Sequence, residues 1–552
     1  MKFTTYLLSF ILMLAVLTAC GSSDGTTTHT ILVSGVVFAG PADGVTVTAK
    51  TTAGVVVATS ASSDSTGVFT VAIPTTALSG DLIFETTGSG AIFTDEATAT
   101  STTLGTLSVF VPAGTLSAGS SVTLDPSSTI VQRLIAGGKT RTAAFSIYSS
   151  SFGYKPDFTI KPAFANISTA STTPQRLAGF RAAVFSQLTN DIIDPTTAST
   201  GIGGAVRQFE LLQAIADDLS DGVLDGKKNG GSVVKTASNF TIPEDILNQY
   251  NASLLKFQTS GNNKTKLTPS LINAPISGKV SLTPSYRVEY VPPTTGEYIS
   301  ADTFQLKITK RSDGTAATGL ATSIVLNPYM VMGTMGGGGN WPGAVVETGT
   351  PGTYTGTIHY SMETYWGLDM YWKLYVFIGS ETALFYPNVA TLTNMTDTVS
   401  VSYYNASDLT GTSRRRYRIW RESLTAGTGG TYDLTLFVSA PDSGTSTHGS
   451  VSSANNYAVY AGQNAWANSP LTINAVTVQY YNGSTWIGLT PVGTNTGKFI
   501  ASSLPLTAGA QGSVYLRLII NGTTYTNANT GTAWDASDST TSNAVQNFKV
   551  TP

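Results

Sequence analysis

The residues of this chain best suited to chemistry are the methionines of one glycine-rich segment. Met330 and Met332 lie two apart, so they share one face of a predicted strand, and Met335 stands beside the glycine run 336–339. Three thioethers form a soft ligand set for Cu(I), to which His359 would add a ring nitrogen. Methionine also fills irregular gaps in hydrophobic cores, so packing is the alternative role for the same side chains.

Aromatic side chains follow this segment and suggest a binding surface. The rings that could form a platform for sugars or a protein partner are Tyr365, Trp366, Tyr371 and Tyr375. Alternation along residues 371–378 gives a second interpretation. Trp372 and Leu374 then belong to the core face of a strand, while Tyr371 and Tyr375 share the other face, which is either exposed or packed on a neighbouring domain.

Two charged clusters each allow a binding role and a structural one. Carboxylates that could hold Ca²⁺ recur at the end of a predicted helix, at Asp217, Asp218, Asp221 and Asp225, but the order of an EF-hand is not met. The alternative is a solvated helix end. A basic run, 414–421, could meet an anionic headgroup or polysaccharide, or could be the charged edge strand of a domain.

Catalytic signatures are missing from the sequence. The three histidines are His29, His359 and His448, and no nucleophile elbow, HExxH motif, phosphate loop or dinucleotide fingerprint accompanies them. We therefore predict no enzymatic activity and no catalytic residues. A polysaccharide-active enzyme remains the alternative, because pairs of carboxylates leave no local signature. With 11% charged residues and a net charge of −3, nucleic acid is an unsuitable partner.

The N-terminal residues have the order of a signal peptide. Lys2 precedes an apolar run, 6–16, too short to span a bilayer, and Leu17-Thr18-Ala19-Cys20 ends it. These last four residues resemble the bacterial lipobox. The resemblance implies that residues 1–19 are removed and that Cys20, the only cysteine, is diacylated and anchors the protein in a membrane. Gly21 replaces the Asp common in inner-membrane lipoproteins, which implies the outer membrane, on its periplasmic or cell-surface face.

The first half of the mature chain combines strands and helices. Residues 20–30 form a polar tether, and residues 31–125 alternate with period two, with a turn at Asp64–Gly67 before Phe69 and Val71. This order resembles the carboxypeptidase regulatory-like domain, a small non-catalytic β-sandwich. Helical spacing then recurs within 126–271, after Pro174, around Phe209–Leu219 and after Pro243, and predicts three amphipathic helices.

The second half returns to strands. Asn482-Gly483 and Asn521-Gly522 each follow an alternating run and suit type I′ hairpin turns. We predict two immunoglobulin-like sandwiches, 272–400 and 401–552. The Met-rich turn, the strand around Gly352-Thr353-Tyr354-Thr355-Gly356 and Trp366 resemble the YtkA/FixH-like immunoglobulin-type domain, some members of which occur with copper handling. The histidines of that family's turn are glycines here, so the copper and packing roles both stay open.

The sequence as a whole predicts a mainly β protein of tandem, immunoglobulin-like β-sandwich domains with a small helical insert. The function predicted is a non-enzymatic lipoprotein of the cell envelope that displays binding or scaffolding domains. Its expected partners are the membrane, through the lipid, and a protein or polysaccharide. No cofactor is expected unless Cu(I) or Ca²⁺ occupies one of the sites above. The alternatives are a copper-handling protein and a polysaccharide-active enzyme.

Overall fold

The fold is mainly β, with 42% of residues in strands and 19% in helices, as the alternation predicts. The structure is a computed structural model. It describes residues 29–552 apart from 88–89, 165–170, 195–200, 202–206, 230, 268–271, 273–277, 333–334, 339–344, 366–369, 391–396, 404–416, 442–447, 452–457, 460–470, 495 and 526–547. The predicted signal peptide, Cys20 and most of the tether therefore lie outside the described residues.

The first sandwich is built from three sheets. One sheet has the order β10-β1-β5 and a second the order β4-β3-β6-β9, with a small third sheet, β2-β7-β8. Their bounds are β1 Thr30–Val37, β2 Ala42–Asp43, β3 Thr46–Thr51, β4 Val56–Thr59, β5 Val68–Pro74, β6 Leu82–Thr87, β7 Ile92–Asp95, β8 Thr100–Thr103, β9 Ser108–Val111 and β10 Ser121–Leu124. Asp64 turns the chain before β5, since its carboxylate accepts the N–H groups of Thr66 and Val68.

Within the described residues five α-helices follow, two more than the three predicted. Their bounds are α2 Pro126–Ala136, α3 Arg141–Phe152, α4 Thr173–Asp191, α5 Arg207–Asp218 and α6 Ile246–Gln258. The predicted helices are α4, α5 and α6. The sequence does carry a start signal for α2: Asp125 and Ser128 form a capping box around Pro126, the first residue of the helix.

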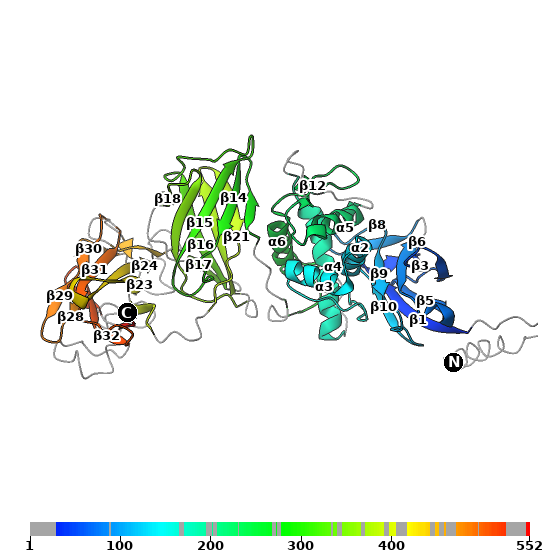
Figure 1. Ribbon diagram of the computed structural model, residues 1–552, viewed down its shortest axis with the longest axis horizontal. Helices are drawn as coiled ribbons and strands as arrows, with labels where there is room; N and C mark the ends of the chain where they lie inside the picture. The colour runs from blue at the N-terminus through cyan, green and yellow to red at the C-terminus, as the bar shows by residue number, and fades with distance from the viewer. Residues whose placement is uncertain are drawn as a thin grey trace, which may run out of the picture.

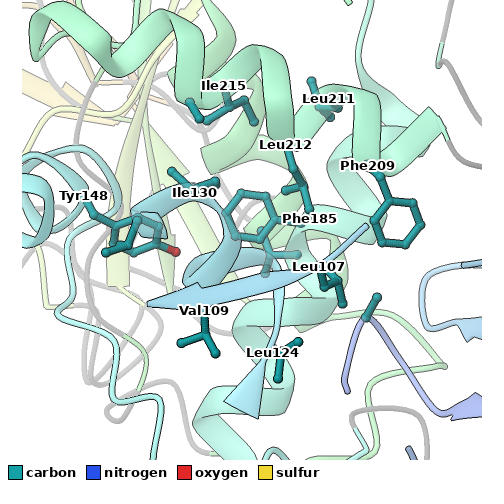
Figure 2. Close-up of a cluster of buried hydrophobic side chains, with 14 of the residues drawn as sticks. Leu107, Val109, Leu124, Ile130, Tyr148, Phe185, Phe209, Leu211, Leu212 and Ile215 are labelled. Carbon is teal, nitrogen blue, oxygen red and sulfur yellow. The ribbon is translucent and has the colours of Figure 1, made fainter. Parts of the chain in front are cut away.

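The first sandwich and the helices share one hydrophobic core. Residues of the first sandwich such as Leu107, Val109 and Leu124 pack with Ile130 of α2 and Phe185 of α4 in a continuous cluster, shown in Figure 2. Because apolar contact is continuous across residue 125, the predicted boundary between a sandwich and a helical domain divides a single core. We call this body, residues 29–258, the proximal unit.

The middle sandwich consists of two facing sheets. Their orders are β13-β14-β15-β19-β18 and β17-β16-β20-β21. The bounds are β13 Val280–Leu282, β14 Tyr286–Val291, β15 Ala301–Lys310, β16 Ile324–Met332, β17 Met335–Gly338, β18 Val346–Glu347, β19 Thr353–His359, β20 Met370–Ile378 and β21 Glu381–Phe385. Trp372, Leu374, Val376 and Ile378 all lie in its core, as the alternation predicts.

The distal sandwich is built around the sheet β22-β23-β24-β31-β30, which faces β29-β28-β33-β34. Its strands are β22 Ser400–Tyr403, β23 Tyr417–Ala426, β24 Tyr432–Pro441, β25 His448–Ser450, β26 Ala458–Val459, β27 Leu471–Thr472, β28 Val476–Tyr481, β29 Trp486–Gly488, β30 Thr490–Pro491, β31 Lys498–Leu504, β32 Gly512–Val514, β33 Leu516–Ile520, β34 Thr523–Tyr525 and β35 Phe548–Val550. Small pairs, β26-β27 and β32-β35, complete it, and β25 pairs with β24.

The two predicted hairpin turns differ. Asn521 and Gly522 both have positive φ and connect the paired residues Ile520 and Thr523, which confirms the two-residue turn. At the other hairpin Tyr481 pairs with Trp486, so the loop has four residues, 482–485. It is longer because the Asn482 side chain accepts the N–H groups of Ser484 and Thr485 and organises a wider turn.

The three bodies are arranged along one long axis. Figure 1 shows the strands of the proximal unit near one end, the middle sandwich between, and the distal sandwich at the other end. The five helices lie between the first strands and the middle sandwich. Among the described helices, none has the length and apolar character needed to cross a bilayer.

Candidate functional site

The methionines of the predicted copper site belong to a packed hairpin. Met330 is 1% exposed in the core of the middle sandwich, and Met332, partly buried, packs against the same core. Met332 pairs with Met335 across the turn, whose residues 333–334 lie outside the described residues, as does the side chain of Met335. The shared face predicted for Met330 and Met332 is therefore the inner face of the sandwich, where thioethers fill the core.

His359 has partners of a different kind. It ends β19, in the sheet opposite β16, and is fully buried. Its ring stacks against Phe437 at 4.7 Å between centroids and lies 5.1 Å from Trp420. Both rings belong to the distal sandwich. Within the described residues no group of three or more His, Cys, Asp or Glu side chains is arranged to hold a metal ion.

A carboxylate locks this histidine in place. Glu422 of β23 lies 2.5 Å from His359 Nε2 and 2.8 Å from the Lys498 ammonium. Burial alone would raise the pKa of Glu422, but the hydrogen bonds and charges of His359 and Lys498 outweigh burial and hold that pKa below its ordinary value. His359, Glu422 and Lys498, with Trp420 and Phe437, thus form a latch between the middle and distal sandwiches.

The predicted aromatic platform is divided among different environments. Tyr365 is 50% exposed, Tyr371 is buried in the core shared with the proximal unit, and Trp366 lies outside the described residues. Tyr375 is half-buried and stacks on Phe377 with centroids 6.2 Å apart. The outer face of β20 therefore contacts the proximal unit at Tyr371 and carries the half-buried rings of Tyr375 and Phe377 further along.

The acidic cluster at the end of α5 organises its own loop. Asp218 is fully buried, and its carboxylate accepts the N–H groups of Asp225 at 3.1 Å and Gly226 at 2.8 Å. Burial raises the pKa of Asp218 to about 7, although these two hydrogen bonds oppose the rise. Asp221 and Asp225 likewise accept backbone N–H groups within the loop. Three of the four carboxylates considered for Ca²⁺ thus bind the backbone of their own loop.

The basic run is only partly described, since 404–416 lie outside the described residues. The strand that follows is β23, which lies between β22 and β24 and is not an edge. The edge-strand interpretation is therefore wrong for this strand. Arg418 lies over the Trp420 ring at 4.7 Å, and Arg421 forms an ion pair of 2.7 Å with Asp397.

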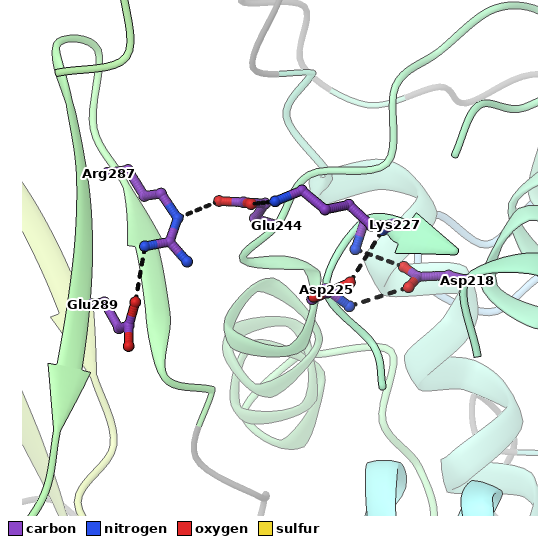
Figure 3. Close-up of polar contacts among 7 residues, drawn as sticks. Asp218, Asp225, Lys227, Glu244, Arg287 and Glu289 are labelled. Atoms are coloured by element: carbon purple, nitrogen blue, oxygen red, sulfur yellow. Dashed lines mark hydrogen bonds and ion pairs between the residues drawn. The ribbon is translucent and has the colours of Figure 1, made fainter. Parts of the chain in front are cut away.

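One ion pair, extended by a second pair on each side, joins the proximal unit to the middle sandwich. Glu244, just before α6, pairs with Lys227 and with Arg287 of β14, and Arg287 also pairs with Glu289 at 3.0 Å. Figure 3 shows this chain of charges running from Lys227 through Glu244 to Arg287 and Glu289 on the sheet. Hydrogen bonds to both sides restrain Arg287, so the network sets the approach of the two bodies.

Helix α6 also closes the edges of both sheets of the middle sandwich. The Asn248 amide donates to the carbonyl of Val280 in β13 at 2.6 Å and to that of Leu384 in β21 at 3.3 Å. Asp245 accepts the N–H of Leu282 at 3.0 Å. Backbone groups that an edge strand would leave open are therefore satisfied by the helix, and this junction is specific.

A cleft of about 1020 Å³ lies beside this junction. Its helical wall includes Asp191, Asp194, Asp245, Gln249, Ala252 and Ser253. The opposite wall, from strand ends and loops of the middle sandwich, includes Thr283, Ser285, Tyr286, Lys310, Arg311 and Ser312. One wall thus carries carboxylates and the other carries cations, and hydroxyl groups lie on both.

The carboxylates of the helical wall are engaged. Asp191 pairs with Lys256 and accepts a hydrogen bond from Ser253 at 3.2 Å. Asp245 accepts from Leu282 and, at 2.8 Å, from Gln249, and burial raises its pKa. Because these oxygens accept hydrogen bonds from the protein itself, they hold the wall in position. A wall of this kind is better suited to binding than to acid–base catalysis.

The opposite wall is also fixed by hydrogen bonds. Arg311 donates to the carbonyls of Thr283 at 2.7 Å and Pro284 at 3.4 Å. Glu381 accepts from the hydroxyls of Thr283 and Ser285. The two walls come from residues 191–253 and 282–312, so no local pattern in the sequence could have marked the cleft, and the sequence analysis missed it.

Comparison with known proteins adds no relative. Searches of protein families, curated proteins and solved structures found no match to this chain.

Proposed function

We propose that this chain is a non-enzymatic lipoprotein of the bacterial outer membrane, anchored through Cys20, that displays β-sandwich domains for binding or scaffolding in the cell envelope. The observation that carries the proposal is the series of three bodies along one axis, with both junctions made by specific contacts (Figure 1). A chain tethered at residue 20 would hold its distal sandwich away from the anchor. Such a shape serves reach and presentation.

The alternatives receive less support from the described residues. Met330 packs in a core, and His359 is engaged by Glu422, so neither is oriented as a copper ligand. The carboxylates of the cleft hold its wall together instead of facing each other across a substrate position. Binding is the function that this arrangement favours.

Protease digestion of intact and lysed cells tests the proposal, with Cys20→Ser as the unanchored control. We expect the wild-type chain to fractionate with the outer membrane and the variant to be released. Digestion on intact cells would place the protein on the surface and favour adhesion, whereas protection until lysis would place it in the periplasm. A wild-type chain that is soluble after lysis would contradict the anchoring.

A further inference from the structure

We propose that the cleft between α6 and the middle sandwich binds a neutral, polyhydroxylated ligand, a short oligosaccharide. The cleft is the one lined by Gln249 and Ala252 on one side and by Tyr286 and Lys310 on the other. This inference deepens the proposed function, because it gives the display protein a ligand class, and it rests on that function for its setting in the envelope.

Size and rigidity favour a ligand site. The volume, about 1020 Å³, is at the upper end of the range of small-molecule pockets, which occur preferentially between domains. Asn248 and Asp245 fix the two walls relative to each other through hydrogen bonds to β13 and β21. A cleft whose walls are already held in position loses little freedom when it binds, so more of the contact energy appears as affinity.

The charges of the walls select the class of ligand. Asp191 and Asp245 lie on the helical wall and Lys310 and Arg311 on the opposite wall, and Lys256 already balances the charge of Asp191. An anion would meet carboxylates, and a cation would meet ammonium and guanidinium groups. Hydroxyl groups donate to one wall and accept from the other, so a polyol bridges the two without net charge.

The lining also offers apolar surface for the carbon skeleton of a sugar. Tyr286 is half-buried on one side, and Ile193 is 46% exposed on the other. Gln249 of the helical wall is held in position, since its carbonyl accepts the Ile193 N–H at 3.0 Å and its amide donates to Asp245. An aromatic ring beside fixed polar groups is the combination that packs against C–H faces while ordering the hydroxyls.

The test uses the full mature chain with Cys20→Ser and an array of oligosaccharides, neutral hexose and N-acetylhexosamine oligomers among them, followed by calorimetry on the positives. Ala252→Trp fills the cleft from an exposed helix position and removes no hydrogen bond. We expect it to weaken binding at least about tenfold, ~1.4 kcal/mol. Ser150→Trp, at an exposed position of α3 outside the cleft, is the matched control and should bind as the parent does.

Lys310→Ala is the second variant, because Lys310 is exposed and its loss leaves the fold intact even if the tryptophan variant unfolds. It should weaken binding severalfold. The proposal is overturned if no oligosaccharide binds at millimolar concentration, if the cleft variants bind as the control does, or if only inorganic phosphate or a zwitterionic dipeptide binds. Cell fractionation is a separate measurement, so failure here leaves the anchoring proposal intact, and the reverse also holds.

Discussion

Burying an ionised carboxylate costs free energy unless its oxygens accept hydrogen bonds. For Asp218, burial raises the pKa, and the hydrogen bonds from Asp225 and Gly226 partly offset that rise. Its pKa lies at about 7, against 3.8 for an ordinary aspartate. Between these values the folded chain holds a proton that the unfolded chain has released, so raising the pH lowers the free energy of unfolding. We expect the unfolding temperature of the proximal unit to fall from pH 4 to about 7 more steeply than that of Asp218→Asn. Parallel slopes in the two melting series would show that Asp218 does not titrate there.

Met330 offers a test of the packing role against the copper role. Leucine has a similar volume, so Met330→Leu should lower the free energy of unfolding by less than about 1.5 kcal/mol in urea titrations. Cu(I) competition titrations should give the same result for the parent and the variant. Copper binding by the parent that disappears in the variant would restore the metal interpretation.

At the scale of elements, α2 depends on its capping box. Asp125 accepts the N–H of Ser128 at 2.6 Å, and burial raises the pKa of Asp125 to about 6. Asp125→Ala should lower the free energy of unfolding of the proximal unit by ~1 kcal/mol, within a range of about 0.5–2. Asp125→Asn is the control, because asparagine caps helices equally well and should retain most of the stability. The difference is measured by denaturant unfolding of both variants at one pH.

The periodicity of apolar residues was enough to predict the helices and strands that have one face in the hydrophobic core. The helical spacing of Phe180, Val184 and Leu188 predicted α4, and the alternation of Trp372, Leu374 and Val376 predicted β20. Helix α3 was not predicted because serines interrupt its apolar residues, so its helical periodicity is weak. The cleft and the latch were not predicted for another reason. Each brings together side chains from distant segments, such as His359 and Glu422, and such contacts produce no local pattern in the sequence.

At the scale of the whole molecule, His359 controls how the distal sandwich is held. His359→Ala removes a hydrogen bond to a charged group, worth about 1.5–3 kcal/mol, together with two ring contacts. We expect small-angle scattering to show a larger and more variable end-to-end dimension, with the melting of the separate sandwiches little changed. Tyr365→Ala, an exposed tyrosine of the same sandwich, should leave the scattering unchanged. An unaltered His359→Ala profile would mean that other contacts set the junction.

Acid should loosen the same junction. The pKa of Glu422 is depressed in the folded chain, so its contribution is present above the ordinary glutamate value and is lost as the pH falls through the lower, folded value. Scattering should therefore show the parent chain extending or becoming more variable at strongly acidic pH. Glu422→Gln should lack that transition and should have a looser junction at neutral pH.

The two junctions differ in how much holds them. Within the described residues, the Glu244–Arg287 ion pair, the Asn248 amide and a shared core join the proximal unit to the middle sandwich, whereas the latch beyond consists of one buried histidine, its carboxylate, Lys498 and two rings. If the chain is pulled between a lipid at one end and a bound load at the other, both joints carry the same tension. The contacts of the latch would then break before those of the other junction. The distal sandwich would separate from the middle sandwich, and the cleft would keep its shape.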